Sequence, residues 1–168
     1  MTDYFAGLDG NLDEYDTPHA GHDMTGQLTT ADDAKRFMLA GKATVTLVSK
    51  KTHTRFTFKI SAAPSGEDTF FVGLLNGPDN ESNYAYVGRI ARGVFWPERR
   101  VPRAGDIGRN APSSRAFDWT WRALARGTMP DQLEIWHEGQ CGRCGRKLTV
   151  PESIKSGFGP ECINKLLG

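Results

Sequence analysis

Apolar and polar residues alternate through the middle of the chain and predict antiparallel strands. In residues 55–60, Phe56, Phe58 and Ile60 share one face of an extended segment, and polar side chains share the other. Residues 43–48 show a similar alternation before a short polar turn, so the two segments are expected to pair as a hairpin with one buried face. Further strands are expected at residues 69–75, 84–90 and 94–96. Because no helix alternates with these strands, the pattern predicts a meander of antiparallel strands.

Helix signals flank this meander on both sides. Thr30 before an acidic turn and Gly41 after it predict a short helix ahead of the first strand. Pro112 and Gly127 are the expected start and stop of a second helix. The core-facing stripe of this helix is expected to consist of Phe117, Trp121 and Leu124. A last short helix is expected to begin at Pro160.

These elements predict an α+β fold, in which an antiparallel β-meander with flanking helices precedes a C-terminal treble-clef-like or zinc-knuckle module. A chain of 168 residues can bury a core of its own, so one main domain is expected. We expect residues 1–29 to form an acidic flexible tail or docking arm, residues 30–131 the α+β domain, and residues 132–168 the zinc module. No apolar run approaches the length that a transmembrane helix needs.

All three cysteines lie near the end of the chain, and their spacing predicts a zinc site. Cys141-x2-Cys144 places two thiolates on one side of a tight turn, and Cys162 follows a Gly-Pro pair that opens a helix. The Zn²⁺ is expected to be structural, because a segment of roughly 30 residues has too little core to fold without a staple. An odd number of cysteines, two of them close in the chain, argues against disulfides.

The fourth zinc ligand is expected to be His137, at the end of the strand before the first cysteine. Three cysteines and one histidine form a common closed structural site. Glu138, Glu161 or a histidine from the amino-terminal part are alternatives for the same position. No catalytic residue is predicted, because four protein ligands leave no open position at which zinc could activate water.

The C-terminal segment resembles a known family. Residues 137–162 read His-Glu-Gly-x-Cys-Gly-Arg-Cys-Gly-Arg-x-Leu-Thr-x-Pro-Glu-Ser-Ile-x-x-Gly-x-Gly-Pro-x-Cys, which is similar to a zinc-finger-like family of unknown function found in bacteriophage and prophage proteins. Residues 75–88, Leu-Asn-Gly-Pro-Asp-Asn-Glu-Ser-Asn-Tyr-Ala-Tyr-Val-Gly, also resemble these phage proteins. The resemblance implies a phage or prophage origin and a bacterial host cytoplasm, but it implies no activity.

The net charge of +1 conceals a strong asymmetry along the chain. Residues 1–33 contain eight acidic residues and neither lysine nor arginine. Residues 89–126 contain nine arginines, three acidic residues and no lysine. Arginine without lysine favours bidentate contacts with phosphate or carboxylate groups.

The arginine-rich segment supplies the candidate binding surface. One face of the second helix is expected to carry a tryptophan among arginines, an arrangement that suits stacking of an unpaired base beside phosphate contacts. The candidate residues for binding nucleic acid or a partner are Arg99, Arg100, Arg103, Arg109, Arg115, Trp119, Arg122 and Arg126. An acidic protein partner or a merely solvated face is the alternative, because a basic face marks charge preference and not the identity of a ligand.

These features predict a non-enzymatic phage accessory protein that binds nucleic acid. The alternative is a protein-binding inhibitor of a bacterial host machine, for example an anti-defence factor such as an anti-CRISPR, whose acidic tail would mimic phosphates. A small zinc-dependent hydrolase is a third possibility. The sequence lacks the motifs of phosphate loops, nucleophile elbows and zinc proteases, so an enzyme is not expected.

Overall fold

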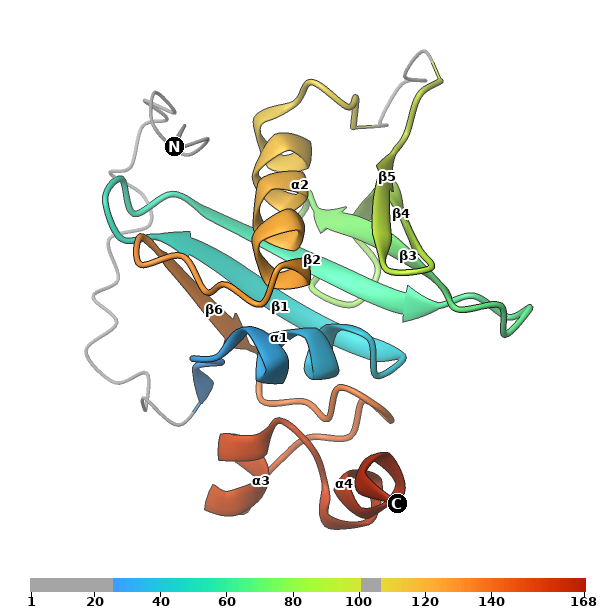
Figure 1. Cartoon of the computed structure of the whole chain (residues 1–168), viewed down its shortest axis with the longest axis vertical. Coiled ribbons are helices and arrows are strands. Elements are labelled where there is room, and N and C mark those ends of the chain that lie inside the picture. The colour runs from blue at the N-terminus through green and yellow to red at the C-terminus, as the bar shows by residue number, and fades with distance from the viewer. Residues whose placement is uncertain (1–25, 101–106) are drawn as a thin grey trace.

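The protein is built on one antiparallel sheet with helices packed against one of its faces (Figure 1). The computed structural model describes residues 26–100 and 107–168. Helices α1 (Ala31–Met38) and α2 (Pro112–Ala125) lie on the same side of the sheet, and α3 (Pro151–Ser156) and α4 (Pro160–Leu167) follow it in the chain. No helix in these described ranges is long and apolar enough to cross a membrane.

Six strands of the described chain form the sheet in the order β5-β4-β3-β2-β1-β6. They are β1 (Lys42–Ser49), β2 (Arg55–Ala62), β3 (Thr69–Leu75), β4 (Tyr84–Ala91), β5 (Val94–Pro97) and β6 (Leu133–His137). The predicted α+β meander is therefore confirmed for the first five strands. The chain then passes through α2 and returns as β6, which pairs antiparallel with β1.

Ring contacts between the sheet and α2 form the centre of the core. Phe117 of α2 lies between Phe58 of β2 and Phe95 of β5, with ring centroids 4.9 and 4.8 Å apart respectively. Trp121, one turn further along, is buried and donates its indole N–H to the carbonyl of Gly93, at 3.0 Å. The expected core-facing stripe of the helix is thus confirmed.

Both predicted helix starts near the sheet are confirmed by their local chemistry. The Thr30 hydroxyl accepts the backbone N–H of Asp33, at 3.1 Å, which caps the first turn of α1. Pro112 occupies the first turn of α2, and the helix ends before Gly127, whose φ of +77° suits a residue without a side chain.

The expected boundary between residues 131 and 132 falls just ahead of a strand of the main sheet. Leu133 and Ile135 of β6 are buried in the same core as β1, so this part of the expected zinc module belongs to the sheet. Residues 26–29, expected to end the acidic tail, also contact β6. There Leu28 is buried and its backbone N–H donates to Ile135, at 2.8 Å. The remainder of the expected tail, residues 1–25, lies outside the described residues.

Phe37 at the end of α1 joins the C-terminal segment to this core. Its ring centroid lies 5.7 Å from that of Phe158 and 5.4 Å from that of His137. A Cβ added at Gly142 or Gly157 would lie 2.8 or 2.7 Å from a carbon of the same ring. The C-terminal segment approaches Phe37 this closely because both positions lack a side chain.

We expect Phe37→Ala to lower the free energy of unfolding by about 3–5 kcal/mol, because a fully buried ring leaves a cavity that its neighbours cannot fill. Urea denaturation of both proteins measures the difference. The matched control is Leu167→Ala, which removes an apolar side chain that is 69% exposed and should change stability by no more than about 0.5 kcal/mol. Equal stability of Phe37→Ala and wild type would show that this contact does not hold the segment.

Candidate metal centre and arginine surface

The three cysteines converge at one point beside the sheet. Cys141 and Cys144 lie in the turn after β6, and Cys162 lies in the first turn of α4. Their Sγ atoms all lie within 4.8 Å of one another, and Cys141 and Cys162 are buried. Three thiol groups at this separation can hold a metal ion.

Backbone hydrogen bonds shape the turn that presents the first two cysteines. The N–H of Cys141 donates to Arg146, at 2.8 Å, and the N–H of Gly145 donates back to Cys141, at 2.8 Å. Gly145 has a φ of +78°, a conformation that glycine adopts without steric cost. The spacing therefore produces a knuckle, as the sequence predicts.

A second set of contacts brings Cys162 to the knuckle. Helix α3 ends at Gly157, whose φ of +79° turns the chain back, and its carbonyl accepts the N–H of Gly142, at 3.0 Å. Pro160 then opens α4, which places Cys162 in its first turn. The glycine and proline positions thus determine where the third thiol lies.

The surroundings of the cluster favour the thiolate form of Cys141 and disfavour that of Cys162. Burial raises the pKa of Cys141, but the backbone N–H groups of Gly159, Cys144 and Arg143 lower it, to about 7 overall. Burial raises the pKa of Cys162, the neighbouring cysteines 144 and 141 raise it further, and the Arg143 side chain, 3.9 Å from its sulfur, offsets only part of that shift. Thiolate is the form that binds a metal, so the donor set fits a soft cation.

His137 does not lie in the cysteine cluster. It is buried at the end of β6, where its Nδ1 accepts the N–H of Gly139, at 3.0 Å, and its Nε2–H donates to the carbonyl of Ile154. Burial lowers the pKa of the ring, which keeps it neutral in these contacts. The ring of His137, expected to be the fourth ligand, thus connects the end of β6 to α3.

The alternatives for the fourth ligand are also placed apart from the cysteines. Glu138 is exposed and accepts the hydroxyl of Thr46 on β1. Glu161 is exposed at the start of α4. Among the described residues, the group suited to a metal consists of the three cysteines, and the histidines before residue 26 lie outside these residues.

Two residues of this centre escaped sequence reasoning. Phe37 is far from the cysteines in the chain, and nothing in its own segment predicts the contact. The sequence signal for this contact is the presence of glycine at positions 142 and 157, where a side chain would meet the Phe37 ring. The guanidinium of Arg143 lies 3.9 Å from the sulfur of Cys162, a contact that the spacing of the cysteines does not predict.

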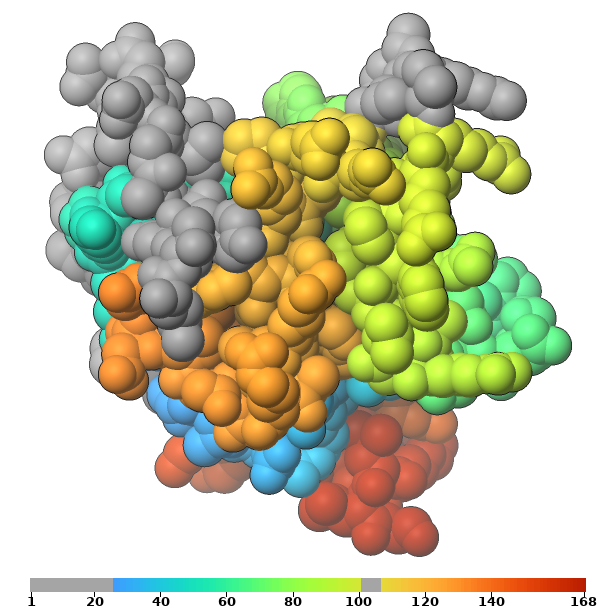
Figure 2. Space-filling view, turned by 45° about the horizontal axis from the view of Figure 1, so that its top comes forward, coloured from blue at the N-terminus to red at the C-terminus, as the bar shows by residue number. Residues whose placement is uncertain are grey.

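The predicted arginine residues fall into two groups. Arg99 and Arg100, after β5, and Arg109, before α2, line one hollow of about 400 Å³, which we call the arginine hollow. In Figure 2 the yellow segment that leads into α2 lies beside the yellow-green end of β5. Arg103 lies outside the described residues.

The second group lies on α2 itself. Arg115, Arg122 and Arg126 are exposed, and Asp118 holds the Arg122 guanidinium at 3.0 Å. Trp119 is half-buried and packs against the hydrophobic core. On this face the arginine side chains are therefore more exposed to solvent than the ring of Trp119.

Comparison with known proteins identifies one segment. Residues 134–167 match a family of unknown function (DUF6011). The matched segment contains most of β6, both C-terminal helices and all three cysteines. No curated protein and no solved structure matches the chain.

We expect Co²⁺ titration of the metal-free protein to give intense sulfur-to-cobalt absorption, which Cys162→Ala should weaken because it removes one thiolate donor. His137→Ala should keep this absorption and the stoichiometry of one ion per chain, because both ring nitrogens already contact backbone groups. Loss of tight Co²⁺ binding in His137→Ala would instead show that the ring turns from Ile154 and ligates the metal. Lys155→Ala, an exposed change on α3, is the control.

Proposed function

We propose that this chain is a non-enzymatic phage or prophage accessory protein that binds nucleic acid through its arginine surface and holds a structural zinc ion. The phage setting and a host cytoplasmic location rest on the resemblance of residues 75–88 and 137–162 to phage proteins. The binding activity rests on the arrangement of the arginines. The zinc assignment rests on three converging thiols, which are donors that Zn²⁺ prefers.

The observation that carries the binding proposal is the arginine hollow. Arg99, Arg100 and Arg109 come from two separate segments and line one concave site. The Glu98 carboxylate in the same site accepts the backbone N–H of Arg100, at 2.9 Å. Planar guanidinium groups match the oxygens of a phosphate, so a hollow lined by three arginines suits such a ligand.

The exposed arginines of α2 extend the proposed surface beyond the hollow. Arg115 lies one turn from the segment that lines the hollow, and Arg122 and Arg126 continue along the helix. Asp118 neutralises part of this face through its contact with Arg122. The hollow is therefore the part of the surface where phosphate contacts should contribute most to binding.

The zinc ion would act on this surface only through the fold. Its thiol donors lie in the C-terminal segment, which packs on Phe37 near the C-terminal end of α1. The bound ion would cross-link this segment. We therefore expect metal removal to loosen the segment without direct loss of a phosphate contact.

We expect a fluorescent oligonucleotide to bind the wild-type protein with a steep dependence on salt between about 50 and 200 mM, because each phosphate contact releases a counterion. The variant Arg99→Ala, Arg100→Ala, Arg109→Ala should bind more weakly and should lower the salt slope by about two. Fluorescence anisotropy with a single-stranded oligonucleotide and its duplex measures both quantities.

The control variant Lys50→Ala, Lys51→Ala, Lys155→Ala removes the same charge from exposed positions outside the arginine surface. It should keep the wild-type salt slope, because long-range charge alone is screened at these salt concentrations. If neither oligonucleotide binds the wild-type protein at low salt, the proposal fails, and the arginine surface becomes a candidate interface for an acidic protein, as the inhibitor hypothesis requires.

A further inference from the structure

The face of the sheet turned away from α1 and α2 carries four aromatic side chains at one end. We call this group the aromatic face. It consists of Phe71, Tyr84, Tyr86 and Trp96. Phe71 and Trp96 are 42% and 44% exposed, and no helix in the described part of the chain packs over them. A group of exposed apolar rings on one sheet face marks a candidate binding surface.

Strand register brings these rings together. Phe71 of β3 pairs with Arg89 of β4, and Arg89 pairs with Trp96 of β5, so the three side chains form a row across adjacent strands. A bulge where β3 and β4 change register returns Tyr86 to the same face. Its ring meets that of Phe71 edge to face, with centroids 6.3 Å apart.

Cationic side chains alternate with the rings. The Lys59 ammonium lies 5.4 Å from the centroid of Tyr84, and the Arg99 guanidinium lies 5.7 Å from that of Trp96. None of the ion pairs formed within residues 26–100 and 107–168 involves Lys59, Arg89 or Arg99. The face therefore offers flat apolar surfaces and positive charges side by side.

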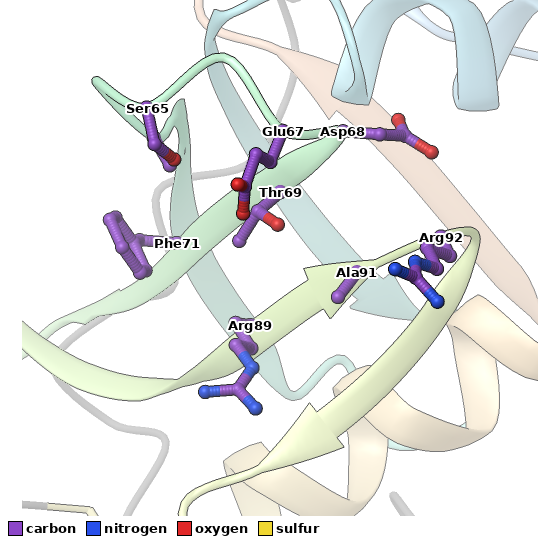
Figure 3. Close-up of a pocket in the computed structure, with 9 residues that line it drawn as sticks. Ser65, Glu67, Asp68, Thr69, Phe71, Arg89, Ala91 and Arg92 are labelled. Carbon is purple, nitrogen blue, oxygen red and sulfur yellow. The ribbon is translucent and has the colours of Figure 1, made fainter.

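A hollow beside Phe71 adds depth to the face. It measures about 700 Å³ and is lined in part by Thr69, Phe71 and Arg89. Figure 3 shows Phe71 and Arg89 on neighbouring strands at one side of the hollow, and Asp68 and Arg92 at the other. Its volume falls in the range of roughly 300–1,000 Å³ that is usual for sites holding small organic groups such as a nucleobase.

We propose that the aromatic face is a stacking platform for single-stranded nucleic acid. Bases would stack on Phe71 and Trp96, and the adjoining phosphates would contact Arg89 and Lys59. A single strand fits this chemistry because its bases expose their flat faces, whereas a duplex keeps them stacked on one another. The inference rests on the proposed nucleic-acid binding and names the form of nucleic acid that the site would take.

Arg99 connects the two sites. Its guanidinium lies over Trp96 on the aromatic face, and the same residue lines the arginine hollow. A single strand whose bases stack on the sheet could thus continue past the end of β5 with its phosphates in the hollow. The site for bases and the site for phosphates would then act on one ligand.

The test compares the double variant Phe71→Ala, Trp96→Ala with wild type by anisotropy, using a single-stranded oligonucleotide and its duplex. Wild type should prefer the single strand, and the variant should bind it at least ten-fold more weakly, because each stacked base contributes about 1–3 kcal/mol. The salt slope should stay unchanged, because no phosphate contact is removed. Phe71→Tyr with Trp96→Phe, which keeps both rings, should restore most of the binding.

The matched control is Val150→Ala with Leu167→Ala, which removes two exposed apolar side chains away from the face. Thermal melting of every variant verifies the fold, and wild-type affinity is expected for this control. If Phe71→Ala, Trp96→Ala binds like wild type while the arginine-hollow variant is weakened, the stacking platform is refuted and the proposed function stands. Absence of binding to wild type refutes both.

Discussion

The close contact between the ring of Phe37 and the glycines at 142 and 157 holds the two halves of the structure together. Through it, the cysteine turn, the end of α3 and the end of α1 share one core with the sheet. Any side chain at either glycine would have to displace a fully buried ring. The cysteine cluster is therefore an extension of the main core, and its geometry depends on a helix that lies about 100 residues earlier in the chain.

The two faces of the sheet serve different purposes. On one face, Phe58 and Phe95 pack against Phe117 of α2. On the other face, the rings near β5 remain accessible and lie among cations. The short strand β5 contributes to both faces, with Phe95 inward and Trp96 outward, and the arginines that follow it line the hollow near α2.

Sequence patterns predicted the features that depend on neighbouring residues. Alternation revealed the hairpin around Phe58, capping chemistry revealed the start of α1 at Thr30, and cysteine spacing revealed the knuckle. Features that depend on distant pairing were not predicted. His137 ends the strand that pairs with β1, and its two ring nitrogens contact Gly139 and Ile154; no local pattern encodes these contacts. Alternation along β3 is consistent with an outward Phe71, but in β4 the bulge between Tyr86 and Arg89 breaks the period of two, so alternation does not place both on one face.

The pairing of β1 with β6 also sets an order of assembly. Thr46 and Glu138, which form a hydrogen bond beside this pairing, are 92 residues apart in the chain. Closing so long a loop costs entropy that only the finished core offsets, whereas the hairpins from β1 to β5 close short loops. During synthesis the meander can form while the C-terminal segment is still being made. The cysteines would then gather last, so that binding of a metal ion would mark a chain that has already completed its sheet.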